Sequence, residues 1–147
     1  RNNAVASTEV KSFEHLICTE QLSRRLGFKV GEELIRVVRV RSLNGNARQV
    51  DHGYFLESIA KGLTPEIAAK SIYDYLEHKR GVKVMASRRT VSVELANDED
   101  CSYLDLGKYN CVAVMESQSY TSDGILFEVT HARTHPEIFH YRVNSKR

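Results

Sequence analysis

Residues 33–55, ELIRVVRVRSLNGNARQVDHGYF, contain two segments of extended character separated by Asn44-Gly45. An Asn-Gly pair is among the strongest signals for a two-residue hairpin loop, because both residues readily adopt a positive φ. The β-branched and aromatic side chains on either side predict strands over residues 33–43 and 47–55. The sequence therefore predicts a β-hairpin.

The first strand of this hairpin carries two arginines on one face. Because side chains alternate along a strand, Arg39 and Arg41 extend the apolar row of Ile35 and Val37, whereas Arg36 lies on the opposite face. Such arginines either reach solvent at the end of the strand or converge on a bound anion, since a guanidinium group matches phosphate and carboxylate. Spacing alone leaves both interpretations open and favours solvent.

Short helices and further strands are predicted along the rest of the chain. Ser12 is a candidate helix N-cap. Helical segments are expected over residues 12–17 and 19–26, from residue 64, and over residues 71–81 and 97–104. Strands are expected over residues 82–95, 111–122 and 125–133. This order lacks the rhythm of a parallel sheet, so the predicted fold class is α+β, with a mainly antiparallel β-sheet flanked by short helices.

A second predicted hairpin turns at Asp123-Gly124. A two-residue loop there sets Ser119 opposite Glu128, on a face that also carries Ser117 and Thr130. This hydroxyl-lined face with one carboxylate suits hydrogen bonding to a polyol, yet a solvent-facing side of an edge hairpin would look the same. The pattern leaves both possibilities open.

Composition limits the function classes. The 147 residues carry 21 basic and 19 acidic side chains, and this near balance argues against a domain that binds the DNA backbone. Apolar residues throughout the chain predict one domain over residues 1–147. The chain starts at Arg1 and stays polar to Thr8, which suggests a piece cut from a longer protein. No apolar run is as long as a membrane helix, so we expect a soluble chain.

Neither a metal site nor a known catalytic motif is evident. The three cysteines are widely spaced and the six histidines are scattered, so we expect no metal and no cofactor. The consecutive acids at 98–100 are better explained by helix capping than by metal binding. No nucleophile elbow, phosphate-binding loop or dinucleotide fingerprint occurs.

Four motifs follow one another along nearly the whole chain. They are Ser12-Phe13, LSRRLGFKVGEELIRVVRVRSLNG at residues 22–45, SIYDYLE at residues 71–77, and DGILFEVTHARTHPEIFHYR at residues 123–142. In this order they resemble the effector-binding UTRA domain of GntR-family transcription regulators, in the HutC-like subfamily.

The resemblance implies a chorismate-lyase-like fold that lacks the activity of that enzyme. It implies a homodimer in the bacterial cytoplasm that binds a small-molecule effector and controls an attached N-terminal winged helix-turn-helix. That DNA-binding domain is absent from this chain, so DNA is expected as a partner only through it. No membrane partner and no enzymatic activity are expected.

The resemblance also implies the positions of a phosphosugar site. In members that sense phosphosugars, the phosphate is held at the positions of Arg39, Arg41, Ser71, Tyr73, Ser12 and Phe13, and the sugar at those of Asp51 and Glu128. An ordinary loop at Asn44-Gly45 would pair Arg41 with Arg48 and turn Asp51 away from the arginines, whereas a β-bulge would turn it back. Thr134 stands where those sensors carry a tyrosine, which implies a different sugar contact.

The segment LTPEIAAKSIYDYLE at residues 63–77 is most similar to the trehalose operon repressors, which implies trehalose 6-phosphate as the effector. We therefore expect the ligand-sensing domain of a transcription repressor. The alternatives are a sensor of another small anionic metabolite, a chorismate-lyase-type enzyme, and a dimerisation module without a ligand.

Overall fold

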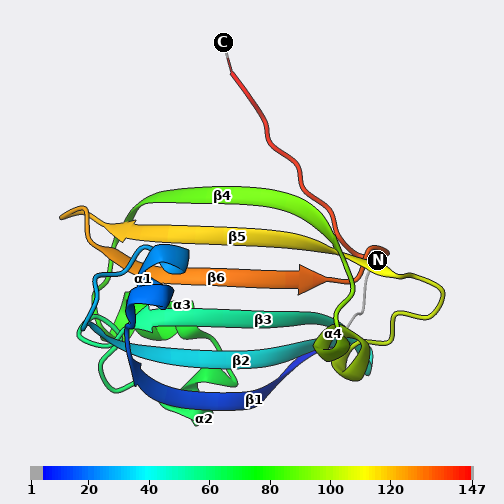
Figure 1. Cartoon of the computed structure of the whole chain (residues 1–147), viewed down its shortest axis with the longest axis horizontal. Coiled ribbons are helices and arrows are strands. Elements are labelled where there is room, and N and C mark those ends of the chain that lie inside the picture. Colours follow the sequence, from blue (N-terminus) through cyan, green and yellow to red (C-terminus); the bar gives the residue numbers. More distant parts are fainter. Residues whose placement is uncertain (1–4, 147) are drawn as a thin grey trace.

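Six antiparallel strands form one sheet in the computed structural model, which describes residues 5–146 (Figure 1). The strands are β1 (Ala6–Ile17), β2 (Glu33–Leu43), β3 (Asn46–Leu56), β4 (Val84–Leu95), β5 (Cys111–Thr121) and β6 (Leu126–Thr134). Their order across the sheet is β1-β2-β3-β6-β5-β4. The predicted class, α+β with a mainly antiparallel sheet, is confirmed. Of the polar start from Arg1 to Thr8, residues 1–4 lie outside the described part of the chain.

The sheet consists of two halves that meet at one seam. β1, β2 and β3 are neighbours in sequence order, and so are β4, β5 and β6. β3 pairs with β6 from Gln49, opposite Thr134, to Phe55, opposite Glu128. Within residues 5–146 this is the one strand pairing that joins the halves, and it leaves β1 and β4 as the two edges.

The predicted helix over residues 12–17 is wrong, because these residues belong to β1. β1 pairs with β2 along its whole length, with a bulge between Val10 and Ser12. The backbone hydrogen bonds of this long pairing outweigh the weak N-cap preference of Ser12. Phe13 packs against the main hydrophobic cluster from this strand.

The hairpin of β2 and β3 contains a β-bulge. Asn44 and Gly45 have the positive φ values, 52° and 81°, that the turn requires. Beyond the turn, Ser42 pairs with Ala47 but Arg41 pairs with Gln49, so Arg48 is the extra residue of the bulge. The bulge returns Asp51 to the side of the arginines, directly opposite Arg39.

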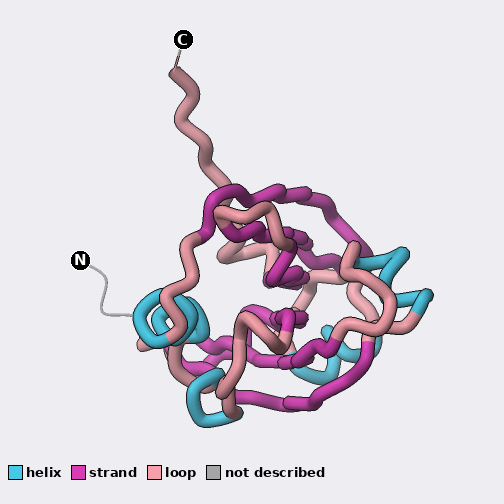
Figure 2. The backbone as a smooth tube through the Cα atoms, turned by 90° about the vertical axis from the view of Figure 1, so that its left-hand side faces the viewer, coloured by secondary structure: helices cyan, strands magenta, loops and turns pink. Residues whose placement is uncertain are grey.

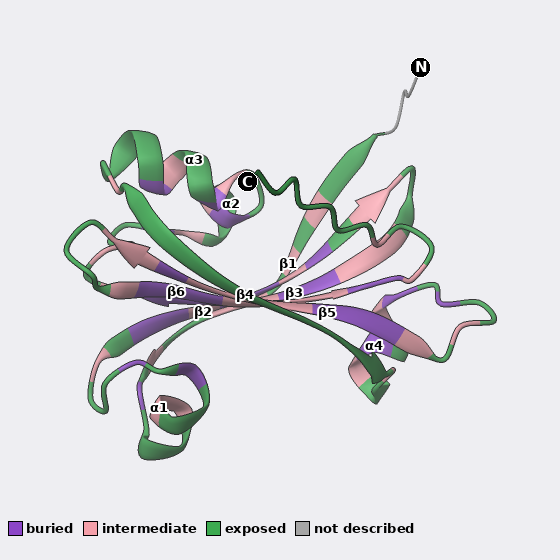
Figure 3. Cartoon of the chain, turned by 90° about the horizontal axis from the view of Figure 1, so that it is seen from above, coloured by how far each residue is buried: buried purple, intermediate pink, exposed green. Residues whose placement is uncertain are grey.

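Short helices cover both faces of the sheet. Figure 3 shows α2 (Pro65–Ala68) and α3 (Ile72–Asp74) over one face, with α1 (Glu20–Leu26) and α4 (Asp98–Tyr103) over the other. Figure 2 shows the same short helices around the sheet from the side.

The predicted helix ends are confirmed where side chains cap them. Thr19 and Ser71 each accept a hydrogen bond from a backbone N–H three residues on, and Gly27 ends α1 with a left-handed conformation. The helix expected over residues 71–81 is instead one α turn followed by a π-helical turn, Tyr75–Lys79. Arg80 donates from Nε to the carbonyl of Ile59 at 3.2 Å and holds this wider turn in place.

Apolar side chains from the sheet and the helices make two hydrophobic clusters. The larger one includes Phe28, Phe55 and Phe127, all at most 2% exposed. A smaller cluster around Val50 and Val112 packs near α4. No helix within residues 5–146 is long and apolar enough to cross a bilayer. In the same range, no three His, Cys, Asp or Glu side chains come together as a metal site would require.

Candidate ligand-binding site

A cavity of about 310 Å³ lies over the sheet, on the face that α2 and α3 cover (Figure 3). Strands from both halves of the sheet contribute to it, together with the loop between α2 and α3. Six of the eight predicted site residues line it: Arg39, Arg41, Asp51, Ser71, Tyr73 and Glu128. The fold thus brings together residues that lie up to 89 positions apart in the sequence (39 to 128).

Arg39 is held by groups of the chain itself. Its Nη2 donates to Oδ2 of Asp51 at 2.5 Å, and its Nη1 donates to the carbonyl of Ala68 at 3.4 Å. Both side chains of the ion pair are mostly buried, with 12% of Arg39 and 9% of Asp51 exposed. The pairing follows from the bulge at Arg48, and it orients the Arg39 guanidinium along the wall of the cavity.

Arg41 and Lys70 supply positive charge that is not neutralised in the same way. Both line the cavity and are exposed, and among the described residues neither forms an ion pair. Ser71 lies beside Lys70, and its Oγ accepts a hydrogen bond from the Asp74 N–H at 3.1 Å while its own proton remains free to donate. This end of the cavity can therefore hold an anion with two cations and a hydroxyl donor.

Tyr73 and Glu128 form the second polar contact of the cavity. The Tyr73 hydroxyl donates to Oε1 of Glu128 at 2.9 Å. Burial of the hydroxyl, with the Glu128 carboxylate beside it, raises the pKa of Tyr73 to about 12, although half of the residue is exposed. Glu128 is only 3% exposed, and this burial raises the pKa of its carboxyl above the usual 4.5.

Around Glu128, the expected pairing of the second hairpin is confirmed. Ser119 lies opposite Glu128, and Ser117 and Thr130 line the cavity on the same face. Sequence reasoning missed three further polar residues of the lining, Gln49, Lys70 and Arg89. Arg89 pairs with Ser117 across β4 and β5. Because no local sequence pattern predicts that strand pairing, the position of Arg89 at the cavity could not be predicted.

Ser12 and Phe13 are not among the residues that line the cavity. The sequence predicts them at the start of a helix over residues 12–17, but they lie in β1, opposite Val38 and Val37. Thr134 is also outside the lining; it is buried and accepts a hydrogen bond from Nε2 of Gln49 at 2.9 Å.

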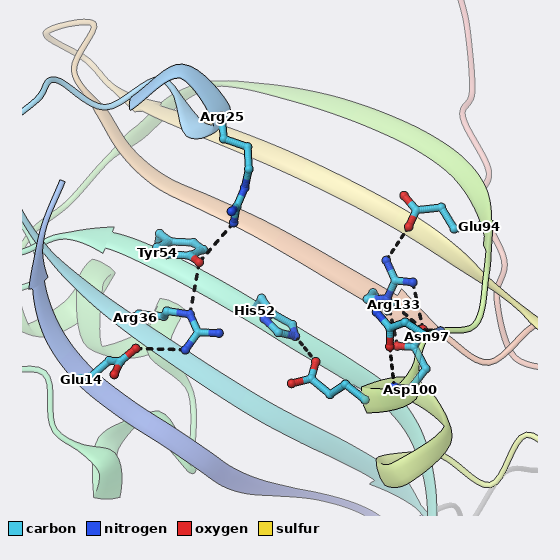
Figure 4. Close-up of polar contacts among 10 residues, drawn as sticks. Glu14, Arg25, Arg36, His52, Tyr54, Glu94, Asn97, Asp100 and Arg133 are labelled. Atoms are coloured by element: carbon cyan, nitrogen blue, oxygen red, sulfur yellow. Dashed lines mark hydrogen bonds and ion pairs between the residues drawn. The ribbon is translucent and has the colours of Figure 1, made fainter. Parts of the chain in front are cut away.

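The charges that line the cavity favour an anion. Four basic side chains, Arg39, Arg41, Lys70 and Arg89, accompany two acidic ones, Asp51 and Glu128. On the opposite face of the sheet the charges neutralise one another (Figure 4).

On that opposite face, two arginines are each paired with acidic side chains. Arg36 donates to Glu14 at 3.0 Å and to the Tyr54 hydroxyl at 3.2 Å. Arg133 donates to Asp100 at 2.9 Å and to Glu94 at 2.7 Å, and the hydrogen bonds to Asp100 raise the pKa of Arg133. The two faces therefore differ, and uncompensated positive charge gathers on the side of the cavity.

This anion-favouring cavity lies in a fold whose family can be recognised. A family model described as the UTRA domain matches residues 1–140. The chain belongs to the UTRA domain family. This UTRA domain is homologous to the effector domains of GntR-family transcription regulators, as the motifs predicted.

Two curated proteins are similar to this UTRA domain in sequence. The HTH-type transcriptional regulator TreR of Bacillus subtilis is 28% identical over 123 residues, which cover 84% of this chain and 52% of TreR. The HTH-type transcriptional repressor NagR of the same species is 23% identical over 79% of this chain and 47% of NagR. The chain thus spans about half the length of these curated relatives.

Solved structures share the same fold. The effector binding domain of the B. subtilis trehalose repressor TreR superposes with a TM-score of 0.88 at 27% identity, covering 96% of this chain and 98% of that domain. A GntR-family regulator from Bacillus cereus superposes with a TM-score of 0.83 at 23% identity, over 96% of this chain and 99% of that one, which shows the fold alone.

Proposed function

We propose that this UTRA domain senses a phosphorylated sugar in the cavity over the sheet and controls the DNA affinity of an attached winged helix-turn-helix. Trehalose 6-phosphate is our first candidate, since the chain is similar to TreR along its length. The single observation that carries the proposal is the excess of four basic over two acidic side chains in a cavity that also offers hydroxyl and amide groups.

The two halves of such a ligand find different partners. Arg41, Lys70 and Ser71 form the end that suits a phosphate group, because charge-assisted hydrogen bonds from cations are the strongest contacts available to it. Gln49, Asp51 and Ser117 can exchange hydrogen bonds with sugar hydroxyls. The cavity is at the lower end of the size range of small-molecule sites, about 300–1,000 Å³.

The domain in this proposal acts as a homodimeric repressor module in the bacterial cytoplasm and is not an enzyme. Residues 1–147 form one effector-binding domain, and DNA is contacted through a winged helix-turn-helix outside this chain. Two copies suit an operator with two-fold symmetry, since each attached DNA-binding domain then reads one half-site. The relatives TreR and NagR are described as transcription regulators, which supports this assignment.

A thermal-shift panel tests the ligand class. Trehalose 6-phosphate, glucose 6-phosphate, the two unphosphorylated sugars, inorganic phosphate and chorismate are compared at equal concentrations. A ligand at 100 times its dissociation constant adds about 2.7 kcal/mol to the free energy of unfolding. We expect stabilisation by a sugar phosphate and none by its unphosphorylated counterpart. Stabilisation by chorismate with formation of product would instead indicate an enzyme of the chorismate-lyase type.

Calorimetric titration of variants tests the residues. Arg41→Ala should weaken the sugar phosphate about tenfold or more, because a charge-assisted contact worth roughly 1.5–3 kcal/mol is lost. Arg36→Ala, on the opposite face of the same strand, should leave the affinity unchanged. Arg89→Ala and Arg88→Ala make the same comparison on β4. Equal losses in all four variants would show only general electrostatic attraction and would contradict the site.

A further inference from the structure

A second cavity adjoins the candidate ligand-binding site, which we now call the first cavity. The second cavity has a volume of about 280 Å³ and lies where β4 and β6 begin, at one end of the sheet. Its lining consists of Tyr73, Leu76, Glu77, Val82, Val84 and Phe127. Tyr73 also lines the first cavity, so the two cavities are neighbours with a common wall.

The local backbone builds the second cavity. The π-helical turn Tyr75–Lys79 supplies Leu76 and Glu77 to its lining. Such turns are rare and occur frequently at functional sites. After this turn, Gly81 has a positive φ of 67°, and the Val82 N–H donates to the carbonyl of Leu76 at 2.9 Å. The chain therefore folds back over the turn and places Val82 in the wall of the cavity.

The second cavity differs from the first in charge. Four of its lining residues are apolar, and two of these, Leu76 and Phe127, are only 1% exposed. Its charged side chain is Glu77, which is 70% exposed at the rim. Among residues 5–146, no basic side chain lines it. The first cavity therefore favours a phosphate group, whereas the second repels an anion and favours a neutral group with an apolar face.

A hexose ring has both properties that the second cavity requires. The C–H groups of the ring form an apolar face, which packs well on the face of an aromatic side chain such as Phe127. The hydroxyl groups of the ring donate hydrogen bonds, and an ionised carboxylate such as that of Glu77 only accepts them. A ring bound here can contact Phe127 with its C–H face while its hydroxyls reach Glu77 near solvent.

We propose that the second cavity is the subsite for the unphosphorylated ring of a disaccharide phosphate, whose phosphorylated ring occupies the first cavity. The inference rests on the proposed function and extends it from the phosphate to the length of the sugar. The first cavity alone is near the lower limit of small-molecule sites, and the two cavities together offer nearly twice its volume.

Tyr73 lies between the two subsites. Its side chain is half exposed, and its hydroxyl donates to Oε1 of Glu128 at 2.9 Å. Rotation of this side chain toward solvent opens a passage for the bond that links the two rings. Ser119 lies opposite Glu128 across β5 and β6, and its hydroxyl can then donate to the carboxyl group in place of Tyr73. The passage therefore opens without leaving Glu128 unpaired.

Calorimetric titration with one-ring and two-ring ligands tests the second subsite. Glucose 6-phosphate is the one-ring ligand, and trehalose 6-phosphate and sucrose 6-phosphate are the two-ring ligands. The wild-type chain should bind at least one of the two-ring ligands about tenfold or more tightly than glucose 6-phosphate, because the second ring buries further surface.

Val84→Trp blocks the second subsite alone. Val84 is 44% exposed at the start of β4, so a larger side chain can enter the second cavity without repacking the core. The variant should lose the preference for two rings and keep the wild-type affinity for glucose 6-phosphate. Met85→Trp is the matched control and should keep the preference, because Met85 is the next residue, is 67% exposed and is not among the residues that line either cavity.

Glu77→Ala provides a second variant that leaves the apolar lining intact. It should weaken the preferred two-ring ligand about threefold or more and leave glucose 6-phosphate unaffected, because only the second ring loses a hydrogen-bond acceptor. Equal affinities of the wild type for one-ring and two-ring ligands, or an unchanged preference in Val84→Trp, would overturn the second subsite while the phosphosugar site stands. Absence of binding by every sugar phosphate would overturn the proposed function and the second subsite together.

Discussion

At the residue scale, the mostly buried ion pair of Arg39 and Asp51 contributes to the stability of the fold. Removing Arg39 leaves the buried carboxylate of Asp51 without its partner, so Arg39→Ala should lower the free energy of unfolding by about 3 kcal/mol. The double variant Arg39→Ala with Asp51→Ala should lose less, because neither charge is then left alone. Urea unfolding of the four proteins in the double-mutant cycle measures the coupling.

The pair of Arg36 and Glu14 is the control for this cycle. Its side chains are 27% and 52% exposed, so solvent screens the attraction and the coupling should stay below about 1 kcal/mol. Equal coupling in the two pairs would contradict the role given to burial.

Glu128 should make stability depend on pH. Burial raises the pKa of its carboxyl, so the folded chain keeps this proton at pH values where the unfolded chain has lost it. The contribution of Glu128 to the free energy of unfolding therefore falls as the pH rises from about 4.5 through the raised pKa. Glu128→Gln should remove this part of the slope in urea unfolding measured between about pH 4.5 and 7. An unchanged slope would show that the carboxyl titrates normally.

At the element scale, a buried carboxylate, Asp100, helps to fix α4 to the sheet, together with the contact of Glu99 with His52 at 2.6 Å. Asp100 is fully buried, accepts from the Asn97 N–H at 3.0 Å within a capping box, and accepts from Arg133. Asp100→Ala should cost about 3–5 kcal/mol, because it leaves Arg133 with Glu94 alone. The exposed neighbour Asp98 should tolerate alanine with a cost below about 1 kcal/mol.

Binding provides the second measurement for α4. The helix lies on the face opposite the cavity, so the affinity of folded Asp100→Ala for its ligand should match that of the wild type. A tenfold loss of affinity with intact folding would indicate that α4 communicates with the cavity.

Elements with local signals were predicted from the sequence. Both hairpins and the helix starts at residues 19, 71 and 97 rest on residues close together in the chain, and each was found. β1 was missed, because its conformation is decided by pairing with β2 rather than by its own residues.

Only the part of the site that depends on side-chain alternation along one strand could be predicted from the residues themselves. Arg39 and Arg41 follow from β2 alone. The bulge that returns Asp51 to them is stabilised by residues far away in the sequence. The carbonyl of Arg48 accepts a hydrogen bond from the His135 N–H at 2.8 Å, and the Arg48 side chain pairs with Glu137 at 3.6 Å. No pattern near Arg48 shows those contacts.

At the scale of the whole molecule, the cavity draws residues from both halves of the sheet. A bound ligand should therefore slow hydrogen exchange in β2 and β3 as well as in β5 and β6, because opening the seam would break its contacts. Amides of α4 should change little. Exchange measured by mass spectrometry with and without the sugar phosphate tests this, and protection confined to β2 and β3 would place the ligand on one half alone.

The seam between β3 and β6 also has a consequence for how the chain folds. Gln49 and Thr134, which it joins, are 85 residues apart, whereas β1 to β3 and β4 to β6 each form a meander of neighbours in sequence. Closing so long a loop costs conformational entropy, and the pairing of β3 with β6 offsets this cost only after both strands have formed. The meanders should therefore assemble first and dock late, so substitutions in the seam, such as Val129→Ala, should speed unfolding more than they slow folding. A chevron in which Val129→Ala mainly slows folding would place the docking early.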